Sequence, residues 1–160
     1  MYADMPELPA EVSTVLAAGE QPVAFTWAEV APVGTPGTAP AFVHLVIAVV
    51  DLVRSRLRMR RVCAQAASAG FPLDRRMALL VSSRRLLVWS ASGFPRRIRE
   101  LLSERPLSSI ASATLPYTGG GGWRTIAIEL AEGIGVRIQI QAQAAEKVVS
   151  ALDGHRRAEA

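Results

Sequence analysis

The chain has 160 residues, of which 50% are hydrophobic and 6% aromatic, and its formal net charge is +4. This length gives room for one domain with a sizeable core and too little for a second full domain. The single cysteine, Cys63, excludes an internal disulfide and a zinc cluster, so nothing in the composition requires an oxidising compartment. The N-terminus is acidic where a secretory signal is basic, and we therefore expect a cytoplasmic protein.

Charge is distributed unevenly along the chain. Residues 1–40 contain five acidic residues and no Lys or Arg, so residues 41–160 carry a net charge of +9. Either the two segments attract each other or the basic part faces an anionic partner. A solvated surface whose charges screen one another is the simplest expectation.

The first forty residues predict a short helix, a strand and a linker. Apolar residues at helical spacing predict a helix over 7–19. The alternation of larger and smaller side chains that begins at Val23 predicts a half-buried strand over 22–30. Three prolines and two glycines mark 31–40 as a linker.

Residues 41–53 form the most apolar stretch of the chain, but they are too few for the roughly 20 residues that a bilayer-spanning helix needs. An apolar stripe at steps of four, three, four and four residues predicts a helix that runs toward Ala69. The members of this stripe are Phe42, Val46, Val49, Val53 and Leu57. Five arginines lie in the same predicted helix, namely Arg54, Arg56, Arg58, Arg60 and Arg61. Their alternation also fits a strand, although the stripe favours the helix. The segment 31–70 is thus expected to be a linker followed by a helical insertion.

Two hairpins are predicted in the second half of the chain. The first joins strands over 77–82 and 86–91. The second joins strands over 125–130 and 135–140, where Ile and Val alternate with smaller or polar residues.

The rest of 71–153 completes the predicted sheet and closes it with a helix. Residues 107–115 predict one more strand, whereas 92–106 are expected to form a loop or a short helical turn. The closing helix has an apolar stripe at i, i+3, i+4 and i+7, ends at Gly154 and is followed by a tail over 154–160. The stripe consists of Ala145, Val148, Val149 and Leu152. This face is expected to dock on the sheet.

This order of segments resembles the pleckstrin-homology-like superfold in its bacterial, actinobacterial-type form. The matching segments are GEQPVAF, FPLDRRMALLVSSRRLLVWSAS, PLSSIASATLP and GGWRTIAIELAEG, followed by the terminal helix. The resemblance covers most of 14–153, with 34–69 as an insertion after the first strand. It implies a single α+β domain over 1–160, in which a bent antiparallel sheet or partial barrel is capped by the C-terminal helix.

The resemblance also implies two kinds of partner, an anionic phospholipid or another protein. Members of the superfold that grip phosphoinositides carry a K-x(n)-R-x-R pattern between their first two strands. Here the corresponding segment contains RSRLRMRR over 54–61, which has no lysine and a different spacing.

No metal site or phosphate-binding loop is indicated by the sequence. The glycines at 119–122 lead into a strand at Trp123, whereas a P-loop needs Gly-Lys-Ser/Thr at the start of a helix. His44 and Asp51 are the nearest approach to a metal-ligand pair, and one pair is insufficient.

Catalytic groups are equally absent from the sequence pattern. Cys63 has no neighbouring His, and although Arg61 favours a mildly lowered pKa of this thiol, a buried small residue is the better interpretation. Glu100 and Glu104, four residues apart with arginines beside them, indicate a surface ion network.

We therefore expect a non-enzymatic binding or scaffold module without a cofactor. In the leading hypothesis it attaches peripherally to the anionic inner face of a membrane, with Phe42, Val46 and Val49 against the acyl boundary and the five arginines of 54–61 against headgroups. The alternative is a protein–protein interaction or homo-oligomerisation module. Nucleic-acid binding ranks behind both, because few aromatic residues accompany the basic ones.

Overall fold

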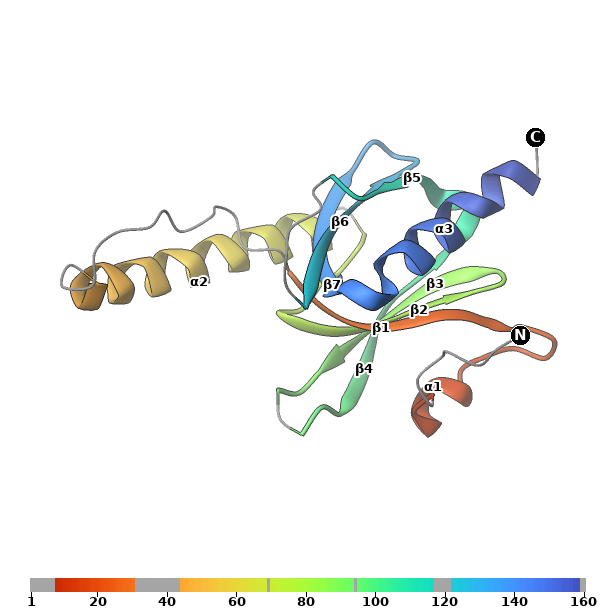
Figure 1. The fold of residues 1–160 in the computed structure, drawn as a ribbon, viewed down its shortest axis with the longest axis horizontal. Helices are drawn as coiled ribbons and strands as arrows, with labels where there is room; N and C mark the ends of the chain where they lie inside the picture. The colour runs from red at the N-terminus through yellow and green to blue at the C-terminus, as the bar shows by residue number, and fades with distance from the viewer. Residues whose placement is uncertain (1–7, 31–43, 69, 94, 117–121, 159–160) are drawn as a thin grey trace.

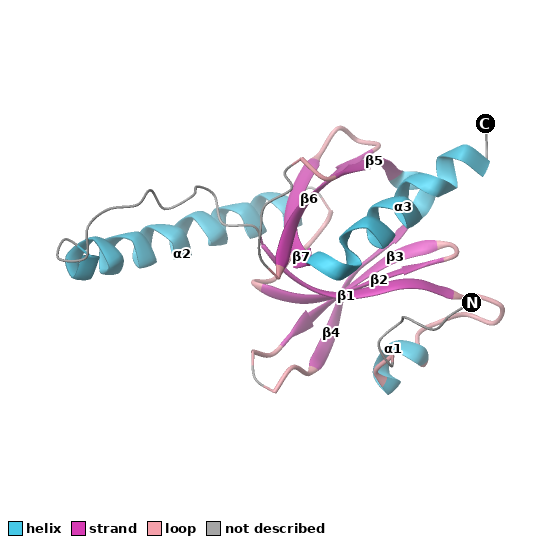
Figure 2. Cartoon of the chain, viewed as in Figure 1, coloured by secondary structure: helices cyan, strands magenta, loops and turns pink. Residues whose placement is uncertain are grey.

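The computed structural model describes residues 8–30, 44–68, 70–93, 95–116 and 122–158, and for 44–55 and 155–158 it describes the backbone alone. The described residues form an α+β fold with one bent antiparallel sheet and a helix packed against it (Figures 1 and 2). The predicted α+β class is therefore confirmed. The predicted linker over 31–40 lies outside the described residues.

Seven strands are formed by the described residues. They are β1 (Pro22–Val30), β2 (Arg76–Ser82), β3 (Arg85–Ala91), β4 (Ile98–Pro106), β5 (Ile110–Thr114), β6 (Trp123–Leu130) and β7 (Gly135–Gln141). Their order in the sheet is β4-β3-β2-β1-β7-β6-β5, and each neighbouring pair is antiparallel. Because β4 and β5 lie at opposite ends of this order, the sheet is open rather than closed into a barrel.

The described residues also form three α-helices and one 3-10 turn. The helical segments are α1 (Ala10–Ser13), α2 (His44–Ser68), the 3-10 turn η1 (Leu107–Ser109) and α3 (Ala142–Ala158). Figure 1 shows α3 within the curve of the sheet and α2 projecting away from it. The helix expected after the first strand is thus present.

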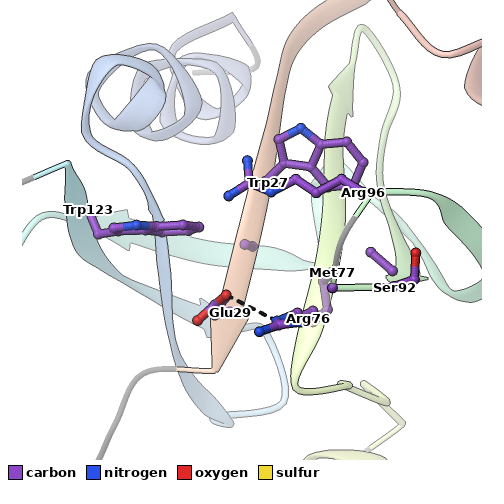
Figure 3. A pocket seen from close by; sticks show the side chains of 10 residues that line it. Trp27, Glu29, Arg76, Met77, Ser92, Arg96 and Trp123 are labelled. Carbon is purple, nitrogen blue, oxygen red and sulfur yellow. Dashed lines mark ion pairs between the residues drawn. The ribbon is translucent and has the colours of Figure 1, made fainter.

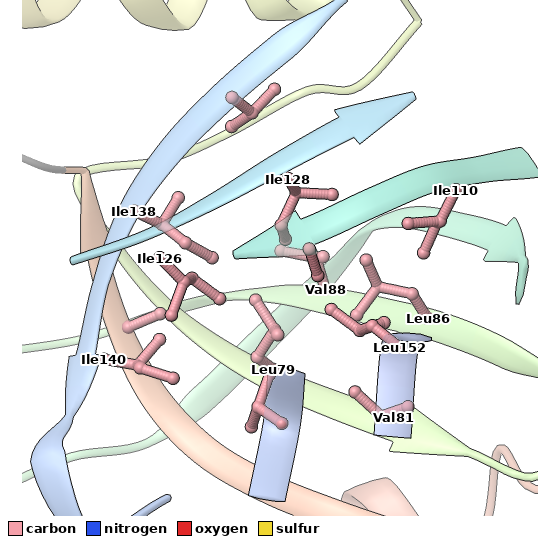
Figure 4. Packing of buried hydrophobic residues seen from close by; sticks show 14 of the residues in the cluster. Leu79, Val81, Leu86, Val88, Ile110, Ile126, Ile128, Ile138, Ile140 and Leu152 are labelled. Carbon is pink, nitrogen blue, oxygen red and sulfur yellow. The ribbon is translucent and has the colours of Figure 1, made fainter. Parts of the chain in front are cut away.

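The main core fills the space between the concave face of the sheet and α3. Ala145, Val148 and Leu152 of α3 are buried there, and Leu152 is only 1% exposed. Figure 4 shows Leu152 beside Leu86 and Val88 of β3. The predicted docking of this helix on the sheet is confirmed, and its contacts extend to β1, β5, β6 and β7.

A second apolar cluster covers part of the opposite, outer face of the sheet. Leu80 of β2 and Leu87 of β3 pack there with Phe25 and with Val12 of α1. This explains why the segments MALLV and LLVW are continuously apolar rather than alternating, because β2 and β3 are buried on both faces.

β1 follows the predicted bounds, and its small residues rather than its large ones face the main core. Its small residues, Ala24 and Ala28, belong to the main core, while Phe25 and Trp27 face the outer cluster and Val23 is 36% exposed. Since α3 contacts β1, small side chains on the inner face let the helix approach closely.

The prediction of a loop or helical turn over 92–106 was wrong for most of that segment. Residues 98–106 form the edge strand β4, which pairs with β3 and has register shifts near Trp89. The sequence IRELLSER favours a helix by local propensity. Its conformation is decided instead by pairing with β3, which the propensity of the segment does not report. Charged residues on β4 also suit an edge strand, because they oppose further pairing.

Three other predicted bounds differ from the structure. The helix expected over 7–19 is helical only at Ala10–Ser13, where a turn toward β1 begins. The strand expected over 107–115 starts with η1 and is extended only from Ile110 to Thr114. The last helix does not end at Gly154 but continues to Ala158.

A buried carboxylate ties the N-terminal segment to the β2–β3 hairpin. The side chain of Glu20 is 0% exposed and accepts hydrogen bonds from Arg85 Nε at 2.8 Å, Arg85 Nη2 at 2.7 Å and the Ala17 N–H at 2.9 Å. Ser82 Oγ donates a further hydrogen bond to it. Arg85, Ser82 and Ala17 outweigh the effect of burial and lower the pKa of Glu20 from 4.5 to about 2. Acidic and basic segments of the chain therefore do attract each other at this point.

Replacing Leu152 with Asp should unfold the domain. An unpaired carboxylate would lie in the main core, at a cost of about 4 kcal/mol or more. Ser150→Asp is the matched control, because Ser150 is exposed on the same helix. Circular dichroism and thermal melting should show an unfolded chain for Leu152→Asp and a native structure for Ser150→Asp. A native melting temperature in both variants would contradict the docking of α3.

Stability should fall in acid through Glu20. Because its pKa is lower in the folded chain than in the unfolded one, its contribution of about 2–3 kcal/mol is present above pH 4.5 and is lost as the pH falls toward 2. Denaturant unfolding of wild type and Glu20→Gln should differ by that amount at pH 7 and converge near pH 2. Glu104→Gln, which removes the exposed partner of Arg85, should change stability by less than about 1 kcal/mol. A Glu20→Gln difference that is independent of pH would refute the role of this carboxylate.

Candidate functional site

The arginines predicted as a binding site lie on the projecting helix α2. Arg56, Arg58, Arg60 and Arg61 are all exposed there, and the side chain of Arg54 lies outside the described residues. The helical prediction for this segment is confirmed, and the strand alternative is excluded.

The C-terminal turns of α2 dock on the body of the protein through one face. Met59, Val62, Cys63 and Ala66 pack against the main core. Leu57, in contrast, is 50% exposed. At about 100° per residue, Leu57 and Ala66 are half a turn out of phase, so the two lie on opposite sides of the helix.

The predicted apolar contact residues can be placed only in part. Phe42 lies outside the described residues, and only the backbone is described at Val46 and Val49. Since the backbone is helical from His44 to Ser68, positions 46 and 49 belong to the same helix as Leu57. None of the described helices is long and apolar enough to cross a bilayer.

Two further residues that the sequence singled out are Cys63 and Glu104. Burial, with a smaller contribution from Asp74, raises the pKa of the half-buried Cys63 thiol, which is opposite to the effect that Arg61 would have. Glu104 pairs with Arg85 across the β3–β4 ladder. Among the described residues, no three His, Cys, Asp or Glu side chains come together as a metal site, and the side chains of His44 and Asp51 are not described.

A second candidate site lies on the outer side of the sheet, and sequence reasoning missed it. The Arg96 guanidinium carbon lies 5.5 Å from the ring centroid of Trp27 and 5.7 Å from that of Trp123 (Figure 3). Arg96 belongs to the loop between β3 and β4. Hydrogen bonds between Ser92 and Arg97 hold the two ends of this loop together. Ser92 Oγ accepts the Arg97 N–H at 3.1 Å, and the Ser92 N–H donates to the Arg97 carbonyl at 2.9 Å. Three distant parts of the chain thus meet at one guanidinium.

An ion pair borders this site. Arg76 Nε lies 3.5 Å from Glu29 Oε1, and both side chains are partly exposed. Gly93 lets the Arg76 guanidinium approach the loop, because a Cβ at this position would lie 1.7 Å from Arg76 Nη1. Together with Arg96 and the two tryptophans, these residues line a cavity of about 100 Å³.

Nothing local in the sequence indicates this second site. Trp27 lies in a strand, Arg96 in a basic loop and Trp123 after a run of glycines, and each has an ordinary explanation in its own segment. The one available signal was that both tryptophans lie on segments with exposed positions. This signal is too weak to predict that Trp27 and Trp123 lie near the same arginine.

The chain was also compared with known proteins. No protein-family model matches it, and no curated protein matches it.

Cys63 should react slowly with alkylating reagents. Its raised pKa keeps the thiol protonated near neutral pH, and the thiolate is the reactive form. The rate with iodoacetamide at pH 8 should be lower in the folded protein than in urea, with an inflection at higher pH. A folded-state rate equal to or above the unfolded one would contradict this environment for the thiol.

Proposed function

We propose that this chain is a non-enzymatic, pleckstrin-homology-like binding module, which attaches to the anionic inner face of the cytoplasmic membrane through α2. An open, bent sheet of seven antiparallel strands with a helix in its concave face supports the resemblance to that superfold. α2 follows β1, where the resemblance places an insertion.

The observation that carries the proposal is the exposure of Leu57 on the side of α2 that faces away from the core. By helical phase, Arg60 and Arg61 flank Leu57 on either side, and both are exposed. An apolar centre between long cationic side chains is typical of a helix that lies in a membrane interface, since arginine stems extend along the apolar layer while their charges reach the headgroups.

The energetics favour weak and reversible attachment. Each Arg near an anionic surface contributes about 1 kcal/mol, so the four described arginines give about 4 kcal/mol, which corresponds to a Kd of about 1 mM. Burying the exposed part of Leu57 adds about 1 kcal/mol, or somewhat less than tenfold. The apolar residues that precede it in the sequence, such as Val46 and Val49, strengthen the attachment further if they enter the interface.

Vesicle co-sedimentation tests this function. Wild type should bind vesicles containing phosphatidylserine but not neutral vesicles, and binding should weaken as salt rises, because exposed charges are screened beyond about 8 Å at physiological ionic strength. Replacing Arg56, Arg60 and Arg61 by Gln should weaken binding by about a hundredfold. Leu57→Ser should weaken it by less than about tenfold without changing the salt dependence.

A matched control separates the helix from total charge. Arg97, Arg99 and Arg137 are exposed on the body of the protein, and replacing them by Gln removes the same charge. This control should retain most of the binding. Equal losses in both triple variants would mean that α2 is not the attachment site. If wild type ignores anionic vesicles at low salt but self-associates through Leu57, the homo-oligomerisation alternative is correct instead.

A further inference from the structure

The cluster at Arg96 has the features of a binding site that is separate from α2. Cation–π contact with two indoles restrains a guanidinium that would otherwise move freely in solvent, because both ring centroids lie within the roughly 6 Å over which this attraction acts. Trp27 and Trp123 are themselves half-buried. Arg96 is thus held in place although it is exposed.

The hydrogen-bond donors of Arg96 are not used within the described structure. Arg76, Arg85, Arg105 and Arg124 each pair with a carboxylate, whereas Arg96 has neither an ion pair nor a side-chain hydrogen bond to a described residue. The N–H groups of a guanidinium lie in its own plane, where two of them can form parallel hydrogen bonds to one oxyanion.

The surrounding charges define which oxyanion fits. Arg76 and Arg96 supply two positive charges and Glu29 one negative charge, so the site has a net charge of +1. The cavity of about 100 Å³ has room for a group of a few heavy atoms, since one water occupies about 30 Å³ of liquid. A planar monoanion matches both the charge and the space.

We propose that this site binds the carboxylate of an acidic peptide segment on a partner protein, with Arg96 as the bidentate anchor. The carboxylate of a glutamate or aspartate is planar and singly charged, and it can meet the outer edge of the Arg96 guanidinium in the guanidinium plane. A phosphate dianion fits less well, because the net charge of +1 at the site balances only one of its two charges. A cation fits less well still, because Arg96 already occupies the rings and Arg76 neutralises Glu29.

The indole N–H signals in an NMR spectrum report on this site directly. The chain has three tryptophans, and Trp89, at 2% exposure in the outer cluster, serves as an internal reference. A short peptide of Glu and Ala should shift the signals of Trp27 and Trp123 more than that of Trp89. The same peptide with Gln in place of Glu should not.

Substitutions should separate a built site from diffuse attraction. Arg96→Gln should weaken peptide binding by about tenfold or more, because it removes charge-assisted hydrogen bonds, whereas Arg99→Gln should change it by less than about threefold. Trp123→Ala should weaken binding, and Trp123→Phe should restore most of it because a ring remains. Replacing Arg56, Arg60 and Arg61 on α2 should leave peptide binding intact, which distinguishes this site from the membrane-binding helix.

Four outcomes would overturn the inference. The first is the absence of any shift at millimolar peptide in low salt, and the second is an equal loss in Arg99→Gln and Arg96→Gln. The third is tighter binding of inorganic phosphate than of the acidic peptide at the same tryptophans. The fourth is displacement of Arg96 by an arginine-rich peptide, which would identify a site for cations.

Discussion

Packing of α3 into the concave face of the sheet is the interaction on which the rest of the fold depends. β1 pairs with β7 over Ala28–Val30, and this short ladder joins the two parts of the sheet. α3 contacts β1 and β2 on one side of that ladder and β5, β6 and β7 on the other. Leu152 and its neighbours on α3 thereby set the curvature that the short ladder could not maintain alone.

The outer face of the sheet depends on a different kind of interaction. Glu20 and Arg85 fix the chain that leads into β1, and the apolar residues around Val12 cover Phe25, Leu80 and Leu87. Phe25 in turn meets Trp27 edge to face, with ring centroids 5.7 Å apart. Trp27 is therefore shared between the outer cluster and the Arg96 site, so that loss of the Glu20–Arg85 pair would disturb the position of one of the two stacking rings.

Both proposed sites use arginine toward anionic partners, but by different physical means. On α2 the charges are distributed along an exposed helix and act with Leu57 over a broad surface, so affinity rises with the number of arginines and falls with salt. At Arg96 a single guanidinium is oriented by two rings, and recognition depends on geometry more than on total charge. The net charge of +9 over residues 41–160 favours the approach of anionic molecules in general.

Local periodicity in the sequence was sufficient to predict β1, both hairpins, the helical character of α2 and the apolar face of α3, because each depends on neighbours within a few residues. It was insufficient for β4, whose extended conformation comes from pairing with β3, and for the outer cluster, which needs α1 to cover the sheet. Only the tertiary structure could decide which side of α2 docks on the core and leaves Leu57 exposed. It alone could also bring Trp27, Arg96 and Trp123 together, because contacts between residues so distant in the chain leave no pattern in a single sequence.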